Sequence, residues 1–177
     1  NADFFENGKK RFLQEARSLA KFSEEPGIVK VRDYFEENDT AYIVMEYLEG
    51  ETLGKRIGRE GRLEAEPFLA KMLPLMHSLK NFHQAGMIHR DISPDNIMFM
   101  KNGTLKLMDF GSARYFTNNE LEMSVILKDG YSPEEQYRKR GNQGPWTDVY
   151  SLCATIYSCI TGVIPENALD RLHSDTV

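Results

Sequence analysis

A predicted β-hairpin joins two polar clusters in the middle of the chain and constrains the fold strongly. Apolar runs at residues 97–100 and 105–108 are separated by the turn sequence Lys101-Asn102-Gly103, and two such runs around a short turn are typical of a hairpin. Asn96 precedes the first run, and Asp109 follows the second. Because the chain crosses back on itself, we expect these two side chains to lie close together.

The residues around this hairpin carry groups that phosphoryl transfer needs. The loop at 90–96 contains Pro94 and Asx residues, which favour irregular backbone over helix. The Asp91 carboxylate can accept a proton from a hydroxyl, while the oxygens of Asn96 and Asp109 suit Mg²⁺ and leave positions for phosphate and water. The two Cys and four His show no paired ligand spacing, which argues against zinc. The alternative is that these polar residues only cap turns between short strands.

The ordered set of His89-Arg90-Asp91, Asn96 and Asp109-Phe110-Gly111 resembles the catalytic core of the protein kinases. The resemblance implies an α+β, two-lobed fold in which a truncated small lobe sits on a mainly helical large lobe. It also implies ATP and Mg²⁺ as cofactors, with Asp91 accepting the hydroxyl proton and Asn96 and Asp109 binding the metal.

The loop also departs from the family at one position. Ser93 stands where Ser/Thr-directed kinases usually carry a Lys that contacts the transferring phosphate and the catalytic Asp. This departure supports a pseudokinase, a binding or scaffolding module, as the alternative function. The sequence Pro94-Asp95-Asn96 resembles that of kinases that act on Ser or Thr hydroxyls of a protein substrate. The sequence of residues 130–137 is similar to that of bacterial Ser/Thr kinases.

Residues 40–45 predict a strand, and residues 46–50 resemble the kinase hinge that pairs with adenine. By this resemblance Met45 is the gatekeeper, and the Glu46 carbonyl and Leu48 amide face the purine. Met98 is assigned to the same ATP site. Read without the resemblance, this stretch is equally compatible with an edge strand running into a loop.

The first segment predicts a helix from about 7 to 21. Phe12, Glu15, Ala16 and Leu19 fall within roughly 100° of one face by the helical period, so a carboxylate lies inside an apolar stripe. A buried Glu needs a partner. The alternative is that Glu15 lies at the edge of the stripe with its carboxylate in water.

The resemblance assigns a role to two residues of that helix. Glu15 matches the helix Glu that pairs with a strand Lys holding the phosphates, and Leu19 matches a spine residue that stacks with Phe110 and His89. That Lys is not expected within this chain, because neither Lys9 nor Lys10 lies in a strand context.

A second helix is predicted over 63–85, ended by Gly86 and kinked at Pro74. We expect His77 and His83 on it to be structural. Its apolar residues recur every three or four positions: Phe68, Met72, Leu75, Met76, Leu79 and Phe82.

The stretch after Gly111 resembles the kinase activation segment, closed by Ser132-Pro133-Glu134. Glu134 is expected to lack its usual late Arg in this chain. The resemblance implies that Arg90 grips a phosphate added to this segment. Candidate acceptors are Ser112, Thr117 and Ser124; the alternative is that Arg90 pairs with a carboxylate such as Glu120 or Glu122. A small-molecule kinase of the aminoglycoside type shares the Asp-to-Asn loop but is not expected to carry Ser132-Pro133-Glu134.

An apolar stretch from Trp146 to Ile164 predicts a buried helix that is too short to span a membrane. Asp148 on it matches the kinase residue that braces the catalytic loop. Cys153 and Cys159 are poorly placed to bond each other, so we expect both to be reduced core residues and the protein to be cytoplasmic.

A net charge of −5 argues against a nucleic-acid partner, because proteins that bind nucleic acid usually carry a basic surface. The resemblance divides the chain into a partial small lobe at 1–45, a hinge at 46–50 and a partial large lobe at 51–177. The sequence begins at Asn1 and holds no Gly-x-Gly-x-x-Gly, so we expect an incomplete domain that is inactive by itself. We also expect a partner chain or further residues to cover the apolar side of Phe12 and Leu19 and the strand edges beside it.

Overall fold

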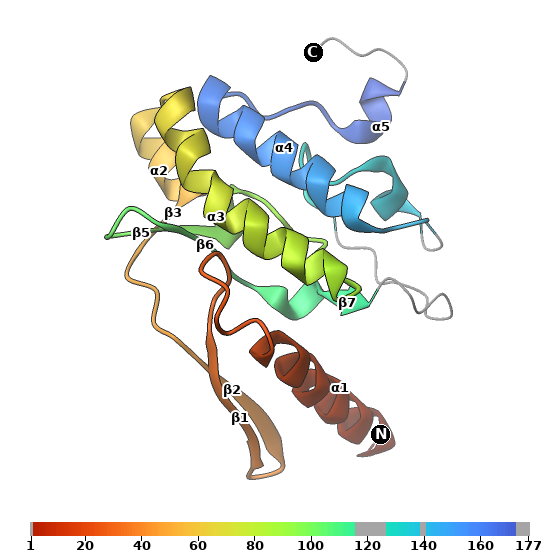
Figure 1. Ribbon diagram of the computed structural model, residues 1–177. Helices are drawn as coiled ribbons and strands as arrows, with labels where there is room; N and C mark the ends of the chain where they lie inside the picture. The colour runs from red at the N-terminus through yellow and green to blue at the C-terminus, as the bar shows by residue number, and fades with distance from the viewer. Residues whose placement is uncertain (1, 116–126, 139–140, 173–177) are drawn as a thin grey trace.

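The fold mixes helices with small antiparallel sheets, which confirms the α+β prediction (Figure 1). A computed structural model describes residues 2–115, 127–138 and 141–172, with side chains from residue 5 onward. Among the described helices, none is long and apolar enough to cross a membrane. The helices are α1 (Ala2–Ala20), α2 (Leu53–Glu60), α3 (Ala65–Gln84), α4 (Pro145–Thr161) and α5 (Ala168–Arg171). The strands are β1 (Val31–Glu37), β2 (Thr40–Met45), β3 (Gly50–Thr52), β4 (Met87–Ile88), β5 (Ile97–Met100), β6 (Leu105–Leu107) and β7 (Arg114–Tyr115). Short 3-10 turns cover Pro94–Asn96, Phe110–Ser112 and Glu134–Tyr137.

The N-terminal part of the chain is helix α1 packed on the β1–β2 hairpin (Figure 1). Strand β2 confirms the strand predicted at 40–45 and pairs antiparallel with β1, from Val31 opposite Met45 to Glu37 opposite Thr40. The hairpin turns at Asn38 and Asp39, whose φ angles are 50° and 56°. Asn and Asp tolerate this left-handed backbone better than most residues, and the register set at the turn holds as far as Asp33, beyond which it shifts by one residue.

Helix α1 begins earlier than predicted and buries only part of the predicted stripe. It spans Ala2–Ala20 rather than 7–21. The helix continues through Gly8, because an interior glycine costs only about 1 kcal/mol relative to Ala. Ala16 and Leu19 are buried, whereas Phe12 is 41% exposed. The expectation of an uncovered apolar side therefore holds for Phe12 and is wrong for Leu19, which lies in the core.

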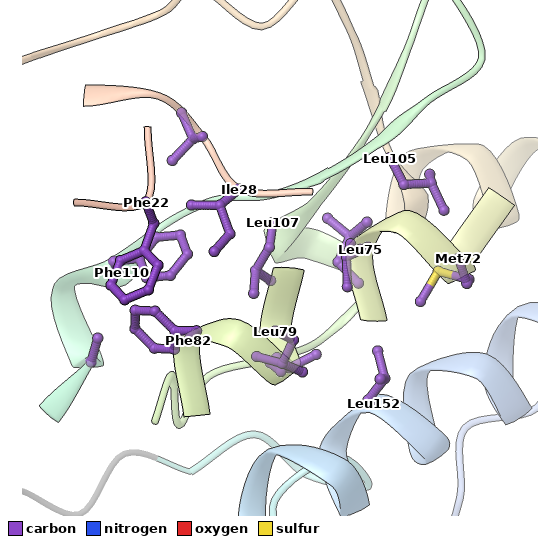
Figure 2. Packing of buried hydrophobic residues seen from close by; sticks show 14 of the residues in the cluster. Phe22, Ile28, Met72, Leu75, Leu79, Phe82, Leu105, Leu107, Phe110 and Leu152 are labelled. Atoms are coloured by element: carbon purple, nitrogen blue, oxygen red, sulfur yellow. The ribbon is translucent and has the colours of Figure 1, made fainter. Parts of the chain in front are cut away.

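Helix α3 forms the centre of the core, between the sheet β3-β5-β6 and helix α4 (Figures 1 and 2). It confirms the helix predicted at 63–85, and Gly86 follows it with φ 82°. Of the six apolar residues predicted to face inward, Phe68, Met72, Leu75, Leu79 and Phe82 are buried, and Met76 packs against them partly buried.

Strand β6 ties the N-terminal part to this core. Val29 N–H donates to Leu107 O at 2.9 Å, and Leu107 N–H donates to Gly27 O at 2.7 Å. Gly27 also lies directly on helix α3, since a Cβ there would lie 2.4 Å from the Leu75 Cα. Only glycine fits at this contact, and its N–H donates to the Ser78 hydroxyl at 3.0 Å.

Several short elements were not predicted from the sequence. Strands β4 and β7 have two residues each and pair with one another, and β3 has three residues and pairs with β5. Runs this short carry no measurable periodicity. The hairpin β5–β6 was predicted, and its second strand ends one residue earlier than expected, at Leu107.

Helix α4 ends earlier than the apolar stretch that predicted it. Gly162 adopts φ 75° as a left-handed cap, and Val163 and Ile164 beyond it are exposed. Both cysteines are unpaired, as predicted. Cys153 is exposed, however, so its assignment to the core is wrong. It lies on the same helical side as Trp146 and Val149, which are also exposed, because residues spaced by three or four share a face.

Candidate active site

Asp148 fixes the backbone of the loop that carries Asp91. Its side chain is fully buried, and its two oxygens accept hydrogen bonds from the N–H groups of His89 and Arg90, each at 2.8 Å. His83 Nε2 contacts the same carboxylate at 2.7 Å, in agreement with the structural role predicted for it. Arg90 has φ 73°, a conformation that costs about 1–2 kcal/mol for a residue with a Cβ. Hydrogen bonds to a charged group contribute about 1.5–3 kcal/mol each, which is enough to hold this backbone.

The His89 ring joins this loop to the strand that leads to Asp109. Its Nδ1 accepts from Asp91 N–H at 3.2 Å, and its Nε2 lies 3.2 Å from Met108 O. An accepting Nδ1 assigns the proton to Nε2, so the ring is neutral and donates to Met108 O. Burial lowers the pKa of His89, and it outweighs the opposing effects of Asp148, Asp91 and Asp109. The ring is therefore a fixed connector between the two polar clusters.

Asn96 is held against Asp91 by its side chain. Its Nδ2 donates to the backbone oxygen and to Oδ2 of Asp91, both at 2.8 Å. Its backbone oxygen accepts from Met108 N–H at 2.9 Å, so Asn96 lies beside the residue that precedes Asp109. The hairpin thus brings Asn96 next to Met108, 12 positions further along the chain. The approach of the Asn96 and Asp109 side-chain oxygens to one cation stays a prediction.

The donor set at this place fits Mg²⁺. The Asn96 amide contacts Asp91 through Nδ2, and its other side-chain atom, Oδ1, is an amide oxygen of the kind that Mg²⁺ accepts. Asp109 adds a carboxylate from a left-handed backbone at φ 60° and ψ 72°. One amide and one carboxylate oxygen suit Mg²⁺, which keeps its other positions for water and phosphate.

Phe110 follows Asp109 into an aromatic cluster at the end of helix α3 (Figure 2). Its ring meets His89 edge-on at 4.6 Å between centroids and Phe82 at 5.4 Å. Phe22 also meets Phe82, at 4.9 Å between centroids, and Leu19 belongs to the same buried cluster. Phe110 therefore anchors the 3-10 turn after Asp109 to the core.

The predicted hinge residues follow strand β2. Met45 is 41% exposed at the end of that strand, while Leu48 packs partly buried against the core. Met98 lies on strand β5 opposite Lys106. The Glu46 side chain bonds to two groups of the protein. It accepts from Lys30 N–H at 2.8 Å and pairs with the Lys106 ammonium.

Glu15 has a partner among the described residues, as the apolar stripe predicted, and this partner is an arginine. Its Oε1 lies 2.6 Å from Nη1 of Arg114 on strand β7, and Tyr115 donates to the Ser18 hydroxyl at 3.1 Å beside it. These contacts tie helix α1 to the segment after Gly111. Burial raises the pKa of Glu15, and the charges of Arg114 and Arg11 oppose this without cancelling it. Sequence reasoning missed Arg114 because the two residues stand 99 positions apart.

Arg90 is buried and hydrogen-bonded to the segment that precedes helix α4. Its Nε donates to Gln143 Oε1 at 2.8 Å, and its backbone oxygen accepts from Gln136 Nε2 at 2.7 Å. Both glutamines were missed from the sequence. Glu134 pairs with Arg138, four residues further along the chain, which is not the late Arg of the family. Ser112 is buried, whereas the other predicted partners of Arg90, Thr117, Glu120, Glu122 and Ser124, lie outside the described residues.

Lys128 reaches the loop at Ser93 and was also missed from the sequence. Its Nζ lies 2.8 Å from the Ser93 hydroxyl oxygen and 2.9 Å from Asp95 Oδ2. Ser93 itself is fully buried. The contact spans 35 residues, and no local pattern could have predicted it.

The chain is similar in sequence to known proteins over most of its length. The chain matches the family described as "Protein kinase domain" over residues 2–175. It is 34% identical over 172 residues to a probable serine/threonine-protein kinase of Clostridium perfringens, which covers 93% of this chain and 24% of that protein. It is 35% identical over 176 residues to the serine/threonine-protein kinase PrkC of Bacillus subtilis, with 94% and 27% covered. It is 32% identical over 157 residues to the serine/threonine-protein kinase PknL of Mycobacterium tuberculosis, and the match covers 88% of this chain and 39% of that protein. The chain thus spans between a quarter and two fifths of the length of these relatives.

Proposed function

We propose that this chain, which belongs to the protein kinase family, carries the catalytic loop and metal ligands of a Ser/Thr protein kinase. The reaction would move the γ-phosphoryl group of Mg·ATP to a Ser or Thr hydroxyl of a protein substrate. The named relatives are serine/threonine-protein kinases at 32–35% identity, which supports the acceptor class.

Asp91 is proposed to orient the acceptor hydroxyl and to take its proton. The hydrogen bond from Asn96 Nδ2 to Asp91 Oδ2 at 2.8 Å fixes that carboxylate and leaves Oδ1 to accept the hydroxyl. Asn96 and Asp109 are proposed to hold Mg²⁺, which neutralises charge on the phosphates when it is bound. Asp148 acts at a distance by holding the backbone of His89 and Arg90.

One observation carries this proposal: the His89 ring bonds the loop of Asp91 to Met108, the residue between strand β6 and Asp109. Turn-capping residues would not need a buried, neutral imidazole between them. A single rigid unit holding a base and metal ligands is what phosphoryl transfer requires, because catalysis there rests on positioning and electrostatics.

The finer assignments belong to the same proposal. The backbone of Glu46 and Leu48 would pair with adenine, with Met45 and Met98 lining the site, and residues 1–45, 46–50 and 51–177 would form small lobe, hinge and large lobe. Arg90 would bind a phosphorylated segment. The unpaired Cys153 and Cys159 support a reducing, cytoplasmic setting.

The experiment is transfer of radiolabelled phosphate from ATP by the full-length protein that contains this sequence. Wild type and Asp91→Asn are compared, and labelled residues are identified after hydrolysis. We expect phosphoserine or phosphothreonine from wild type and a loss of at least about 10²-fold in Asp91→Asn. Equal transfer by the two proteins would refute the assignment of Asp91.

A pseudokinase is the second candidate, favoured by the uncharged Ser93 in the catalytic loop. It predicts nucleotide binding without transfer above the Asp91→Asn level.

A separate prediction concerns the 177-residue chain studied alone. It contains no Gly-x-Gly-x-x-Gly, and we predict negligible turnover and weak Mg·ATP affinity for it. Isothermal titration showing low-micromolar binding together with turnover near roughly 1 per second would contradict that prediction.

A further inference from the structure

The ammonium group of Lys128 lies on the loop between Asp91 and Asn96. It donates to the Ser93 hydroxyl at 2.8 Å and pairs with Asp95 Oδ2 at 2.9 Å. Both contacts are with residues of the loop that holds the proposed base. A positive charge from a distant part of the chain is therefore fixed beside the place where the phosphoryl group would move.

The backbone of Lys128 is held in a tight turn. Its N–H donates to the Ser132 hydroxyl at 2.8 Å, and its oxygen accepts from the N–H groups of Tyr131 and Ser132, each at 2.9 Å. Tyr131 is buried and donates to the Ser158 hydroxyl of helix α4 at 3.3 Å. Gly130 has φ 79°, and a Cβ there would lie 2.5 Å from the Ile164 side chain. The turn is thus anchored to the same helix that carries Asp148.

The geometry leaves Lys128 able to bind an anion. An ammonium group has three donors, and Ser93 and Asp95 use two of them. The Asp95 side chain is 64% exposed, and ion pairs at exposed carboxylates are weak. The ammonium can therefore exchange Asp95 for a phosphate oxygen while Ser93 keeps it in place.

We propose that Lys128 supplies the positive charge that stabilises the transferring phosphoryl group, with Ser93 as its positioning residue. The inference rests on the proposed kinase function. In the step, the bond from the γ-phosphorus to the bridging oxygen of ADP breaks, and the bond to the acceptor oxygen forms. The acceptor proton passes to Asp91, and Lys128 stays protonated throughout. A fixed charge of this kind acts where negative charge develops, so it contributes to kcat more than to ATP binding.

The test compares variants of the full-length protein by steady-state transfer from Mg·ATP, with thermal unfolding to show that each is folded. Lys128→Met is expected to lower kcat by about 10²–10³-fold with the KM for ATP changed less than about threefold. Lys128→Arg should retain more activity than Lys128→Met. The double variant Ser93→Lys with Lys128→Met should recover at least about tenfold, because it returns the charge to the same place from the loop itself. The matched control is Lys30→Met, which removes a surface ion pair to Glu24 of 2.8 Å and should leave kcat unchanged.

Different outcomes test the role of Lys128 and the proposed kinase function separately. Wild-type activity in Lys128→Met, with Asp91→Asn inactive, would overturn the role of Lys128 and leave the kinase function intact. A loss in Lys128→Met without recovery in the double variant would assign Lys128 to anchoring the segment only. A wild-type protein no more active than Asp91→Asn would overturn the kinase function and the role of Lys128 with it.

A second readout does not depend on turnover. An ATP analogue with an acyl group on its terminal phosphate acylates a lysine beside the phosphates: the amine forms an amide, the acyl–phosphate bond breaks, ATP leaves, and a proton goes to water. Peptide mass spectrometry should show Lys128 labelled, with labelling suppressed by Mg·ATP, and in the double variant the label should move to position 93. Labelling of Lys128 no faster than that of Lys30, or indifferent to Mg·ATP, would overturn the proposal.

Discussion

Replacing Asp148 by Asn should weaken both the fold and the catalytic loop. The carboxylate accepts from His89 N–H, Arg90 N–H and the His83 ring at 2.7–2.8 Å while fully buried. Asn keeps one acceptor oxygen and turns an NH₂ group toward one of these donors. A hydrogen bond to a charged group is worth about 1.5–3 kcal/mol, and an orphaned buried donor costs about 1–3 kcal/mol. The expected loss in the free energy of unfolding is therefore about 3–5 kcal/mol.

The same change should reduce turnover beyond its effect on stability. Arg90 holds φ 73° next to Asp91, and without its hydrogen bond to Asp148 the loop can relax toward ordinary backbone. A misplacement of about 1 Å at a reacting group can cost about 10² in rate. Urea unfolding gives the stability change, and kcat is measured at a temperature where the variant is fully folded.

The control for this prediction is Asp33→Asn. Asp33 is exposed on strand β1 and accepts a single backbone hydrogen bond, from Tyr34 N–H at 2.8 Å. Its loss should change stability by less than about 0.5 kcal/mol, as is usual for surface positions. If Asp148→Asn proves no more destabilising than Asp33→Asn and keeps wild-type kcat, the bracing role of Asp148 is wrong.

Three further predictions follow from the titratable groups. Burial raises the pKa of Glu15, so its ionised form destabilises the fold at neutral pH and protonation relieves this. The urea midpoint of Glu15→Gln minus that of wild type should therefore increase from pH 4 to pH 7. A decrease in this difference over the same pH range would refute the prediction. Burial lowers the pKa of His89, so the unfolded state binds more protons than the folded state below about pH 6.5. The free energy of unfolding should therefore fall as the pH drops below that value. The control His77→Gln, which removes a solvent-facing imidazole, should not alter this pH dependence. Burial raises the pKa of Cys159 to about 12, whereas Cys153 is exposed. Iodoacetamide at pH 8 should therefore alkylate Cys153 in the folded protein and Cys159 only in urea. Equal alkylation rates of the two cysteines in the folded protein would contradict the packing of helix α4.

The long elements of this fold could be predicted from the sequence because their patterns are local. Helix α3 follows from apolar residues at helical spacing and a terminal glycine, and the β5–β6 hairpin follows from two apolar runs around Lys101-Asn102-Gly103. The hairpin alone brings Asn96 beside the residue before Asp109. The order of the proposed site residues in the sequence therefore already predicts which of them lie on neighbouring elements.

The parts that could not be predicted are contacts between distant segments. The ion pair of Glu15 with Arg114 and the contact of Lys128 with Ser93 depend on how the segment after Gly111 folds back. A carboxylate in an apolar stripe predicted that Glu15 needs a partner, but not which one. Ser93 marked a missing charge in the loop, and only the fold shows that a lysine from elsewhere stands beside it.

The Asp91 loop and the end of the β5–β6 hairpin are proposed to form one metal-nucleotide site. The most direct test is a crystal structure of the full-length protein with Mn²⁺ and a non-hydrolysable ATP analogue, using anomalous scattering to place the metal. We predict a manganese peak bound by Asn96 Oδ1 and the Asp109 carboxylate, with Asp91 opening onto the same cleft. A metal bound elsewhere, with Asn96 and Asp109 directed to separate surfaces, would contradict it.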